Sequence, residues 1–289
     1  MAVTMMKDIV NPEVMGDMIG AKVEAMLKLT KYAKLDTTLQ GVAGDTKTVP
    51  SWNFIGEAAD VAEGVEVDLT AMTASTKTFT IKKAMKAVGI SQEAVNSGLG
   101  NPIGQAETQL AKAIASKVDA DVLAALLTAT AVSGNGSAGI SYNGIVDAVG
   151  VFNEEEVTEK VMFVAPSQVT TLRKDANFIS ADKYNYNVVA TGEIGMVAGV
   201  HIVPSKRIVA SGDIFTCPIV KLEAASPETE YTEDELAAVT IFLKKDIQTD
   251  AEWKPRSQTH EITTAKYYGV ALTNEAKVVL AKFDATPAV

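Results

Sequence analysis

A single long helix is the strongest structural signal in the sequence. Asn101-Pro102 opens it, because proline has a backbone angle suited to the first helical turn. An apolar stripe follows at helical spacing, formed by Ile103, Leu110, Ile114, Val118, Val122 and Leu126. Lys112, Lys117 and Asp119 lie off this stripe. We expect the helix to span residues 101–131 and to act as a structural spine.

A second amphipathic helix is expected near the start, from residue 12 to about residue 32. Met15, Ile19 and Val23 recur at steps of four residues behind a start signal, Asn11-Pro12. A lone helix cannot bury its apolar stripe by itself. Two interpretations follow: the helix docks on another subunit, which makes Met15 and Ile19 candidates for contact between subunits, or it is an ordinary N-terminal core helix.

Residues 49–90 are predicted to form a long β-hairpin, because apolar residues alternate with polar ones on both sides of a Thr/Ala/Ser stretch. The two arms carry opposite charge: Glu57, Asp60, Glu63, Glu66 and Asp68 on the outgoing arm, and Lys77, Lys82, Lys83 and Lys86 on the returning arm. An isolated two-stranded ribbon is only marginally stable in water. We therefore expect the hairpin to lie across a partner, and the alternative is a pair of edge strands with ordinary solvated charge.

The glycine-rich segment 134–139 ends the spine region and marks a domain boundary. A mixed α/β domain is expected after it. Its predicted elements are a helix over 143–152, strands over 161–164, 200–203 and 214–222, and a short helix after Pro166 capped by Ser167.

The end of the chain is expected to form long strands. Residues 239–243 and 261–283 have strand patterns, with a turn at Thr273-Asn274, and the last strand is expected to pair near the spine helix. Between these strands and the α/β domain, residues 223–235 hold six acids and no base, which predicts an exposed loop.

Composition excludes several classes of function. With 26 Lys and Arg against 36 Asp and Glu, the formal net charge is −10, which argues against wrapping nucleic acid by phosphate neutralisation. One cysteine, Cys217, cannot form an internal disulfide, and the two histidines, His201 and His260, cannot build a multi-histidine zinc site. We find no apolar run long enough for a membrane span and no secretory signal, so a cytosol-like, reducing compartment is expected.

We expect no catalytic, cofactor or metal site. The segment 134–139 matches G-x-G-x-x-G, but a helix precedes it where a dinucleotide fingerprint needs a strand. Cys217 is interpreted as a small buried hydrophobe, and neither histidine belongs to a nucleophile motif. Trp52 and Trp253 could anchor a subunit interface or pack in the core, and Arg173 is a candidate for contact with acids of a neighbour.

The order of these parts resembles the major capsid proteins of tailed bacteriophages, which share the Hong Kong 97 fold. The stretches that carry the resemblance are 9–14, 48–50 to 63–64, 83–93, 163–166 leading to 172–173, 195–203 and 259–282. Together they cover nearly the whole chain. The individual motifs are loose, so the specificity comes from their order and spacing.

The resemblance implies an α+β fold divided in four parts. Residues 1–47 would be the N-arm and residues 48–90 the extended loop, a β-hairpin that reaches over a neighbouring subunit. Residues 91–133 and 251–289 would form the peripheral domain, with its spine helix at 101–131, and residues 134–250 the axial domain around the hexamer or pentamer axis. The charged arms of the hairpin would give orientation and register to that contact.

The function implied is a structural subunit of an icosahedral phage head, without enzymatic activity or cofactor, that assembles as hexamers and pentamers around double-stranded DNA. Negative charge suits a shell that holds DNA without sticking to it. A separate scaffolding protein and a portal are expected partners, no cross-link is assigned, and the location is the virion, with assembly in the host cytoplasm. Two alternatives remain: an encapsulin-like cellular shell around a cargo enzyme, and a nucleotide-dependent enzyme that uses the 134–139 loop.

Overall fold

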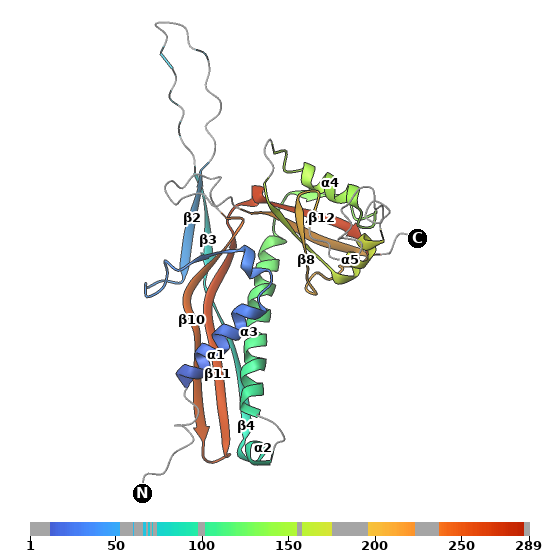
Figure 1. Ribbon diagram of the computed structural model, residues 1–289. Coiled ribbons are helices and arrows are strands. Elements are labelled where there is room, and N and C mark those ends of the chain that lie inside the picture. Colours follow the sequence, from blue (N-terminus) through green and yellow to red (C-terminus); the bar gives the residue numbers. More distant parts are fainter. Residues whose placement is uncertain are drawn as a thin grey trace.

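The computed structural model describes residues 12–52, 60, 66–67, 69, 71, 74–97, 102–154, 158–174, 196–222 and 237–285. The chain has a mixed α+β fold with a four-stranded, a six-stranded and a two-stranded sheet. Figure 1 shows the four-stranded sheet as a long, narrow layer along α1 and α3, with the six-stranded sheet near one end of it. Among the described residues, no helix is long and apolar enough to cross a membrane.

The elements have the following bounds. The helices are α1 (Pro12–Met26), α2 (Gln92–Ser97), α3 (Pro102–Leu126), α4 (Tyr142–Gly150) and α5 (Pro166–Arg173), with short 3-10 turns η2 (Thr30–Tyr32) and η4 (Glu275–Lys277). The first six strands are β1 (Lys34–Asp36), β2 (Thr46–Trp52), β3 (Ala74–Thr80), β4 (Lys82–Ser91), β5 (Val132–Ser133) and β6 (Lys160–Val164). The other six are β7 (Met196–Val197), β8 (Val200–Pro204), β9 (Ile214–Lys221), β10 (Val239–Lys254), β11 (Thr259–Leu272) and β12 (Val278–Asp284).

The spine helix is confirmed as α3, although it is shorter than its pattern predicts. Its stripe from Leu110 to Leu126 is buried in the main core. The helix ends at Leu126 and not near residue 131. The amides of Thr128 and Ala129 bond to carbonyls three residues back, in the 3-10 pattern, and not four residues back as in an α-helix. Residues 127–131 then lead into β5.

The N-terminal helix is an ordinary core helix, as one of the two interpretations predicted. Ile19 and Val23 are buried in the main core, and α1 packs along α3 and β10. The helix ends at Met26, earlier than the predicted residue 32, because the amides of Lys28 and Thr30 bond to the carboxylate of Asp119 on α3 at 3.1 and 3.2 Å. Those amides are therefore diverted from helical bonding.

The four-stranded sheet has the order β1-β10-β11-β4. This pairing corrects the predicted hairpin, because the run from Lys82 to Ser91 is antiparallel to β11 and is not part of the returning arm. Alternation identifies a strand but carries no information on its partner. Among the described residues, the hairpin consists of the pair β2 and β3, from Thr46 opposite Thr80 to Trp52 opposite Ala74.

The six-stranded sheet has the order β5-β12-β9-β6-β8-β7. The strands predicted at 161–164, 200–203 and 214–222 are confirmed as β6, β8 and β9. The predicted last strand, 261–283, is divided into β11 and β12. Its expected pairing near the spine helix is borne out in part, because β11 packs against α3 and β12 pairs with β5, the short strand that follows α3. β12 lies between β9 and β5, and residues 278–281 are all buried because this strand is covered on both faces.

The helices of this second part follow the sequence pattern with one exception. The helix predicted over 143–152 is confirmed as α4, whose cap is Ser141: its hydroxyl accepts a hydrogen bond from the Gly144 amide at 3.2 Å. The predicted cap of α5, Ser167, is wrong. Ala165 is the N-cap and Pro166 occupies the first turn, so Ser167 lies inside the helix. The acidic segment predicted as a loop, 223–235, lies outside the described residues.

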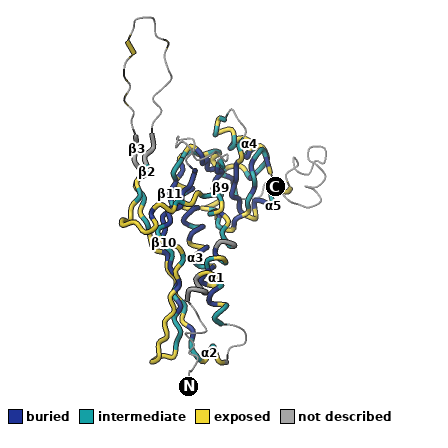
Figure 2. Tube along the Cα trace, turned by 60° about the vertical axis from the view of Figure 1, so that its left-hand side comes forward, coloured by how far each residue is buried: buried dark blue, intermediate teal, exposed yellow. Residues whose placement is uncertain are grey.

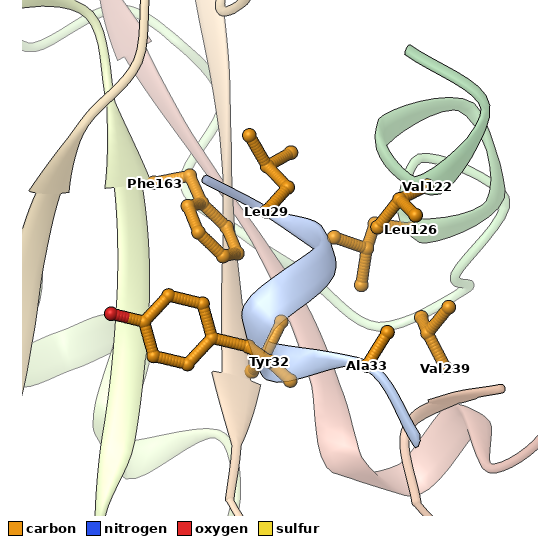
Figure 3. A pocket seen from close by; sticks show the side chains of 8 residues that line it. Leu29, Tyr32, Ala33, Val122, Leu126, Phe163 and Val239 are labelled. Atoms are coloured by element: carbon orange, nitrogen blue, oxygen red, sulfur yellow. The ribbon is translucent and has the colours of Figure 1, made fainter. Parts of the chain in front are cut away.

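The two large sheets meet at an apolar seam beneath η2. Figure 3 shows Leu29, Tyr32 and Ala33 between Val122 and Leu126 of α3 on one side and Phe163 of β6 on the other. The Tyr32 ring meets the edge of Phe163 with 5.6 Å between centroids. The small pocket here is lined by side chains that are almost entirely apolar, so we interpret it as a packing seam.

Burial is uneven along the long sheet. Figure 2 shows dark blue, buried segments where the two large sheets approach each other and a yellow, exposed segment at the far end of β10 and in the turn that leads to β11. The first five residues of β10 are buried, whereas Ala251 to Lys254 are all exposed. The far part of this sheet therefore offers free surface on the isolated subunit.

Candidate assembly surface

The hairpin is attached to the subunit by its own small apolar cluster. Leu39, Phe242 and Ala271 form its buried centre, and Val49, Phe79 and Ile81 pack against them. The rings of Phe79 and Phe242 are stacked with centroids 6.1 Å apart. We call this cluster the hairpin root. It lies on the face of the four-stranded sheet that is turned away from α3.

A glycine permits this close attachment. A Cβ atom at Gly269 of β11 would lie 3.2 Å from the carbonyl oxygen of Thr80 and 3.6 Å from the Cα of Ile81. Backbone atoms cannot rotate out of the way as a flexible side chain can. The chain that leaves β3 therefore crosses β11 at a point where only glycine fits without displacement.

Polar contacts hold the root at its edges. Lys244 pairs with Asp45 at 2.7 Å, and the Ile81 amide donates to the Asp45 carbonyl at 2.8 Å. On the other edge, Lys47 of β2 donates to the Thr38 hydroxyl at 2.8 Å. Apolar packing and these contacts together fix the direction in which the hairpin leaves the sheet.

Beyond the root, the described hairpin residues are exposed. Leu69 is fully exposed, Val67 is 69% exposed, and Asp60 and Glu66 are exposed as well. No described residue forms an ion pair with Asp60 or Glu66. Exposed apolar side chains beside unpaired acids are stabilised by a partner that covers the apolar surface and supplies positive charge.

Some of the predicted contact residues of this hairpin can be placed in the structure and others lie outside the described residues. In backbone register Trp52 lies opposite Ala74 and Lys77 lies opposite Val49. Glu57, Glu63 and Asp68 lie outside the described residues. For these positions, and for exposed Glu66, contact with another subunit stays a prediction.

The predicted basic group on the returning arm is divided between two faces of β4. Lys82 points to the helix side and pairs with Asp121 of α3 at 3.2 Å, so this lysine is engaged within its own subunit. Lys83 lies on the opposite side, with its Nζ 5.6 Å from the Tyr267 ring centroid. Lys86 is exposed.

Asp121 is the centre of a polar group that the sequence pattern did not reveal. Burial raises the pKa of this carboxyl, but hydrogen bonds from Lys117 and Tyr268 and the nearby Lys82 outweigh burial and lower the pKa below its usual value. The pKa of the Tyr268 hydroxyl is raised by burial and by Asp121. The group ties β4, α3 and β11 together.

The remaining predicted contact residues also have definite places. Ile19 is fully buried within its own subunit, and this excludes it as a contact between subunits. Met15 lies in α1, and Arg173 is exposed at the end of α5. Trp253 is 42% exposed and its ring lies 4.3 Å from that of His260. An interface role for Met15, Arg173 and Trp253 is untested.

A second unforeseen polar group supports the six-stranded sheet. Lys160 of β6 and Lys221 of β9 are opposite each other, and both pair with Glu154, at 2.5 and 2.9 Å. Burial raises the pKa of Glu154, but hydrogen bonds from the two lysines dominate and lower it to about 2. The sequence signal that could have indicated this group is a lysine at the end of each of the two strands. When the strands pair, the two like charges meet and require an acid between them.

The residue types that often act as nucleophiles or metal ligands lie in environments typical of structural residues. Cys217 is fully buried, as expected, and burial raises its thiol pKa to about 12, so no thiolate is available for attack. In the described part of the chain, no group of three or more His, Cys, Asp or Glu side chains could hold a metal ion. The prediction that a helix directly precedes the glycine segment 134–139 is wrong, because the short strand β5 lies between α3 and this segment. The next helix, α4, begins only at Tyr142, after the segment has ended, whereas a dinucleotide fingerprint needs a helix that opens within it.

The chain has an exposed hairpin on a packed root and a mixed α+β body whose polar groups hold its elements together. These features are typical of a structural subunit. A family model described as phage capsid protein matches residues 73–280. The chain belongs to this phage capsid family.

A curated relative gives the role within the family. The chain is 31% identical over 271 residues to the major capsid protein of Staphylococcus phage phiMR11, covering 93% of this chain and 91% of that protein. The molecule is thus related along its length to a major capsid protein, the structural subunit of a phage head. Both this relative and the matched family are capsid proteins, which are structural.

Solved structures agree on the fold. The capsid asymmetric unit of cyanophage Pam1 matches with a TM-score of 0.70 at 12% identity, covering 93% of both chains. The Mycobacterium phage Che8 structure matches with a TM-score of 0.68 at 15% identity, covering 91% of this chain and 92% of that one. At sequence identities this low, the similarity to these structures shows a shared fold and nothing more.

Proposed function

We propose that this chain assembles into hexamers and pentamers of an icosahedral phage head with the Hong Kong 97 arrangement, enclosing double-stranded DNA. The observation that carries the proposal is the relation to a major capsid protein, at 31% identity over 93% of this chain. The exposed hairpin on its own root supports it, because such an element gains stability by contact with another copy.

Within that arrangement we assign residues 1–47 to the N-arm, 48–90 to the extended loop and 134–250 to the axial domain. Residues 91–133 and the returning strands form the peripheral domain around α3. Three boundaries are adjusted. β4 and β10 both pair with β11 in the four-stranded sheet along α3, so we place residues 82–91 and 239–254 with the peripheral domain. β12 pairs with β9 and β5, so we place 278–284 with the axial domain.

The shell is proposed to work with a scaffolding protein and a portal, and to assemble in the host cytoplasm. The DNA is held without sequence-specific binding. The net charge of −10 supports this part of the proposal, because an acidic wall does not condense on phosphates. No catalytic role is assigned to the chain.

The test is the size of the purified protein, expressed alone and with a candidate scaffold, by light scattering and negative-stain electron microscopy. Closed shells or rings of five or six subunits are expected. A strictly monomeric protein under both conditions would overturn the proposal. Particles that carry a cargo protein in place of DNA, when isolated from the native source, would favour a cellular shell.

A further inference from the structure

The four-stranded sheet has one face that its own subunit leaves partly uncovered. Tyr268 points toward α3, since its hydroxyl bonds to Asp121, and the next side chain along β11, Tyr267, therefore points to the other side. Backbone register places Lys83 and Lys245 on either side of Tyr267. We call this side the outer face. The hairpin root covers only the part of it around Phe242.

A shallow hollow lies on the outer face next to the hairpin root. It is lined by Gly41, Val42, Lys244, Lys245 and Tyr267. Val42 is 53% exposed, and Met85, two residues from Lys83 on the same side of β4, is 55% exposed. The surface therefore combines apolar side chains with lysines.

The charge of this hollow is positive. Its neighbouring acids are already paired, Asp45 with Lys244 at 2.7 Å and Asp246 with Lys266 at 3.1 Å. In the part of the chain that the structure describes, no acid forms an ion pair with Lys83 or Lys245. Two ammonium groups beside exposed apolar surface fit a ligand segment that is both acidic and apolar.

The chain itself contains such a segment. Residues 66–69 read Glu-Val-Asp-Leu, so in an extended conformation the two acids lie on one side and the two apolar residues on the other. Val67 and Leu69 are exposed in their own subunit. The segment and the hollow thus match in charge and in apolar character. The described residues of the segment, Glu66, Val67 and Leu69, are exposed in the isolated chain, and so is the hollow.

We propose that residues 66–69 of one subunit dock on the outer face of a neighbouring copy, in the hollow lined by Val42, Lys245 and Tyr267 and against Lys83 and Met85 beside it. This inference rests on the proposed function and names the surface that receives the hairpin. The contact joins two different patches of the chain, so it is heterologous and generates rings when the rotation closes. That is the symmetry that hexamers and pentamers require.

Charge reversal gives the first test. The pair Lys83→Glu and Lys245→Glu should raise the protein concentration needed for assembly about tenfold or more. Glu66→Lys with Asp68→Lys should do the same, and the four changes combined should restore assembly toward the original level. Lys86→Glu, exposed on the same strand but on its other side, is the matched control and should have little effect. Failure of the combined variant to recover would contradict the pairing.

Cross-linking locates the contact. Cys217 is buried, so introduced cysteines are the accessible thiols among the described residues. Particles of the Leu69→Cys, Met85→Cys variant, treated with a short bis-maleimide, should give a ladder of linked subunits on a denaturing gel. The matched variant Leu69→Cys, Met18→Cys, with its second cysteine on exposed Met18 of α1, should give none.

The outcomes separate the two proposals. Wild-type particles with no ladder for the 69/85 pair, or with the same ladder for the 69/18 pair, would overturn the docking site and leave the capsid function standing. Absence of any particle or ring from the unmodified protein, alone and with scaffold, would overturn the proposed function itself.

Discussion

The hydroxyl of Tyr268 donates a hydrogen bond of 2.8 Å to the Asp121 carboxylate, and both side chains are buried. This bond joins β11 to α3 across 147 residues of sequence. Lys117 and Lys82 complete the environment of the carboxylate at 2.9 and 3.2 Å. The four groups hold the sheet to the helix independently of apolar packing.

Tyr268→Phe should therefore destabilise the subunit by about 1.5 to 3 kcal/mol, the range for a hydrogen bond to a charged group. The measurement is the free energy of unfolding of unassembled protein in a denaturant titration. Tyr267→Phe is the matched control, because Tyr267 faces away from Asp121 and is only half-buried, and it should cost much less. Equal losses for both variants would contradict the role given to the bond.

The Glu154 group predicts a dependence on pH. The pKa of Glu154 in the folded protein, about 2, lies below the ordinary glutamate value of 4.5. The stabilising effect of its charge is therefore complete above pH 4.5 and is lost as pH falls toward 2. At pH 7, Glu154→Gln should cost about 3 kcal/mol, because Lys160 stays buried without its counter-charge.

The check is the free energy of unfolding of both proteins from pH 7 to pH 3. The gap between wild type and Glu154→Gln should narrow steadily below pH 4.5. A gap that stays constant or widens on acidification would show that the carboxylate does not stabilise the sheet by its charge.

A side chain at Gly269 should lower the stability of the subunit. Gly269→Ala places a methyl group 3.2 Å from the Thr80 carbonyl, and overpacking of this kind costs about 1 to 3 kcal/mol. Gly20→Ala is the control, because a Cβ at Gly20 in α1 has nothing within 4 Å and alanine favours helix. Thermal unfolding should show a lower midpoint for the first variant and an unchanged or higher one for the second.

How far the sequence predicts this structure depends on the kind of signal. The stripe from Leu110 to Leu126 predicts α3 because burial repeats at the helical period. The end of α1 is not visible in the same way. It depends on Asp119, which lies off the apolar stripe and binds amides about 90 residues away.

Strand pairing shows the same limit. Alternation predicts a strand at residues 82–91, but its partner β11 lies far along the chain and is chosen by packing against α3. As a result, the predicted basic arm is divided: Lys82 serves its own subunit and Lys83 lies on the outer face. The acidic character of residues 57–68 is a local property and is seen directly in the sequence.

Asp119 should control the order of the segment that follows α1. It accepts bonds from the Lys28 and Thr30 amides and from the Thr30 hydroxyl at 2.8 Å. Asp119→Ala should raise amide hydrogen exchange at residues 28–33 by about tenfold or more, because each bond to a charged group contributes about 1.5 kcal/mol or more. Lys112→Ala, exposed on the same helix, should leave exchange there unchanged.

The central claim is that this chain is a shell subunit whose rooted hairpin contacts the next copy. Cryo-electron microscopy of particles formed by the purified protein, with scaffold if it is needed, tests the claim most directly. The account predicts closed shells of five- and six-membered rings in which residues 66–69 lie on the outer face of an adjacent subunit. Rings in which each hairpin contacts only its own subunit would contradict it.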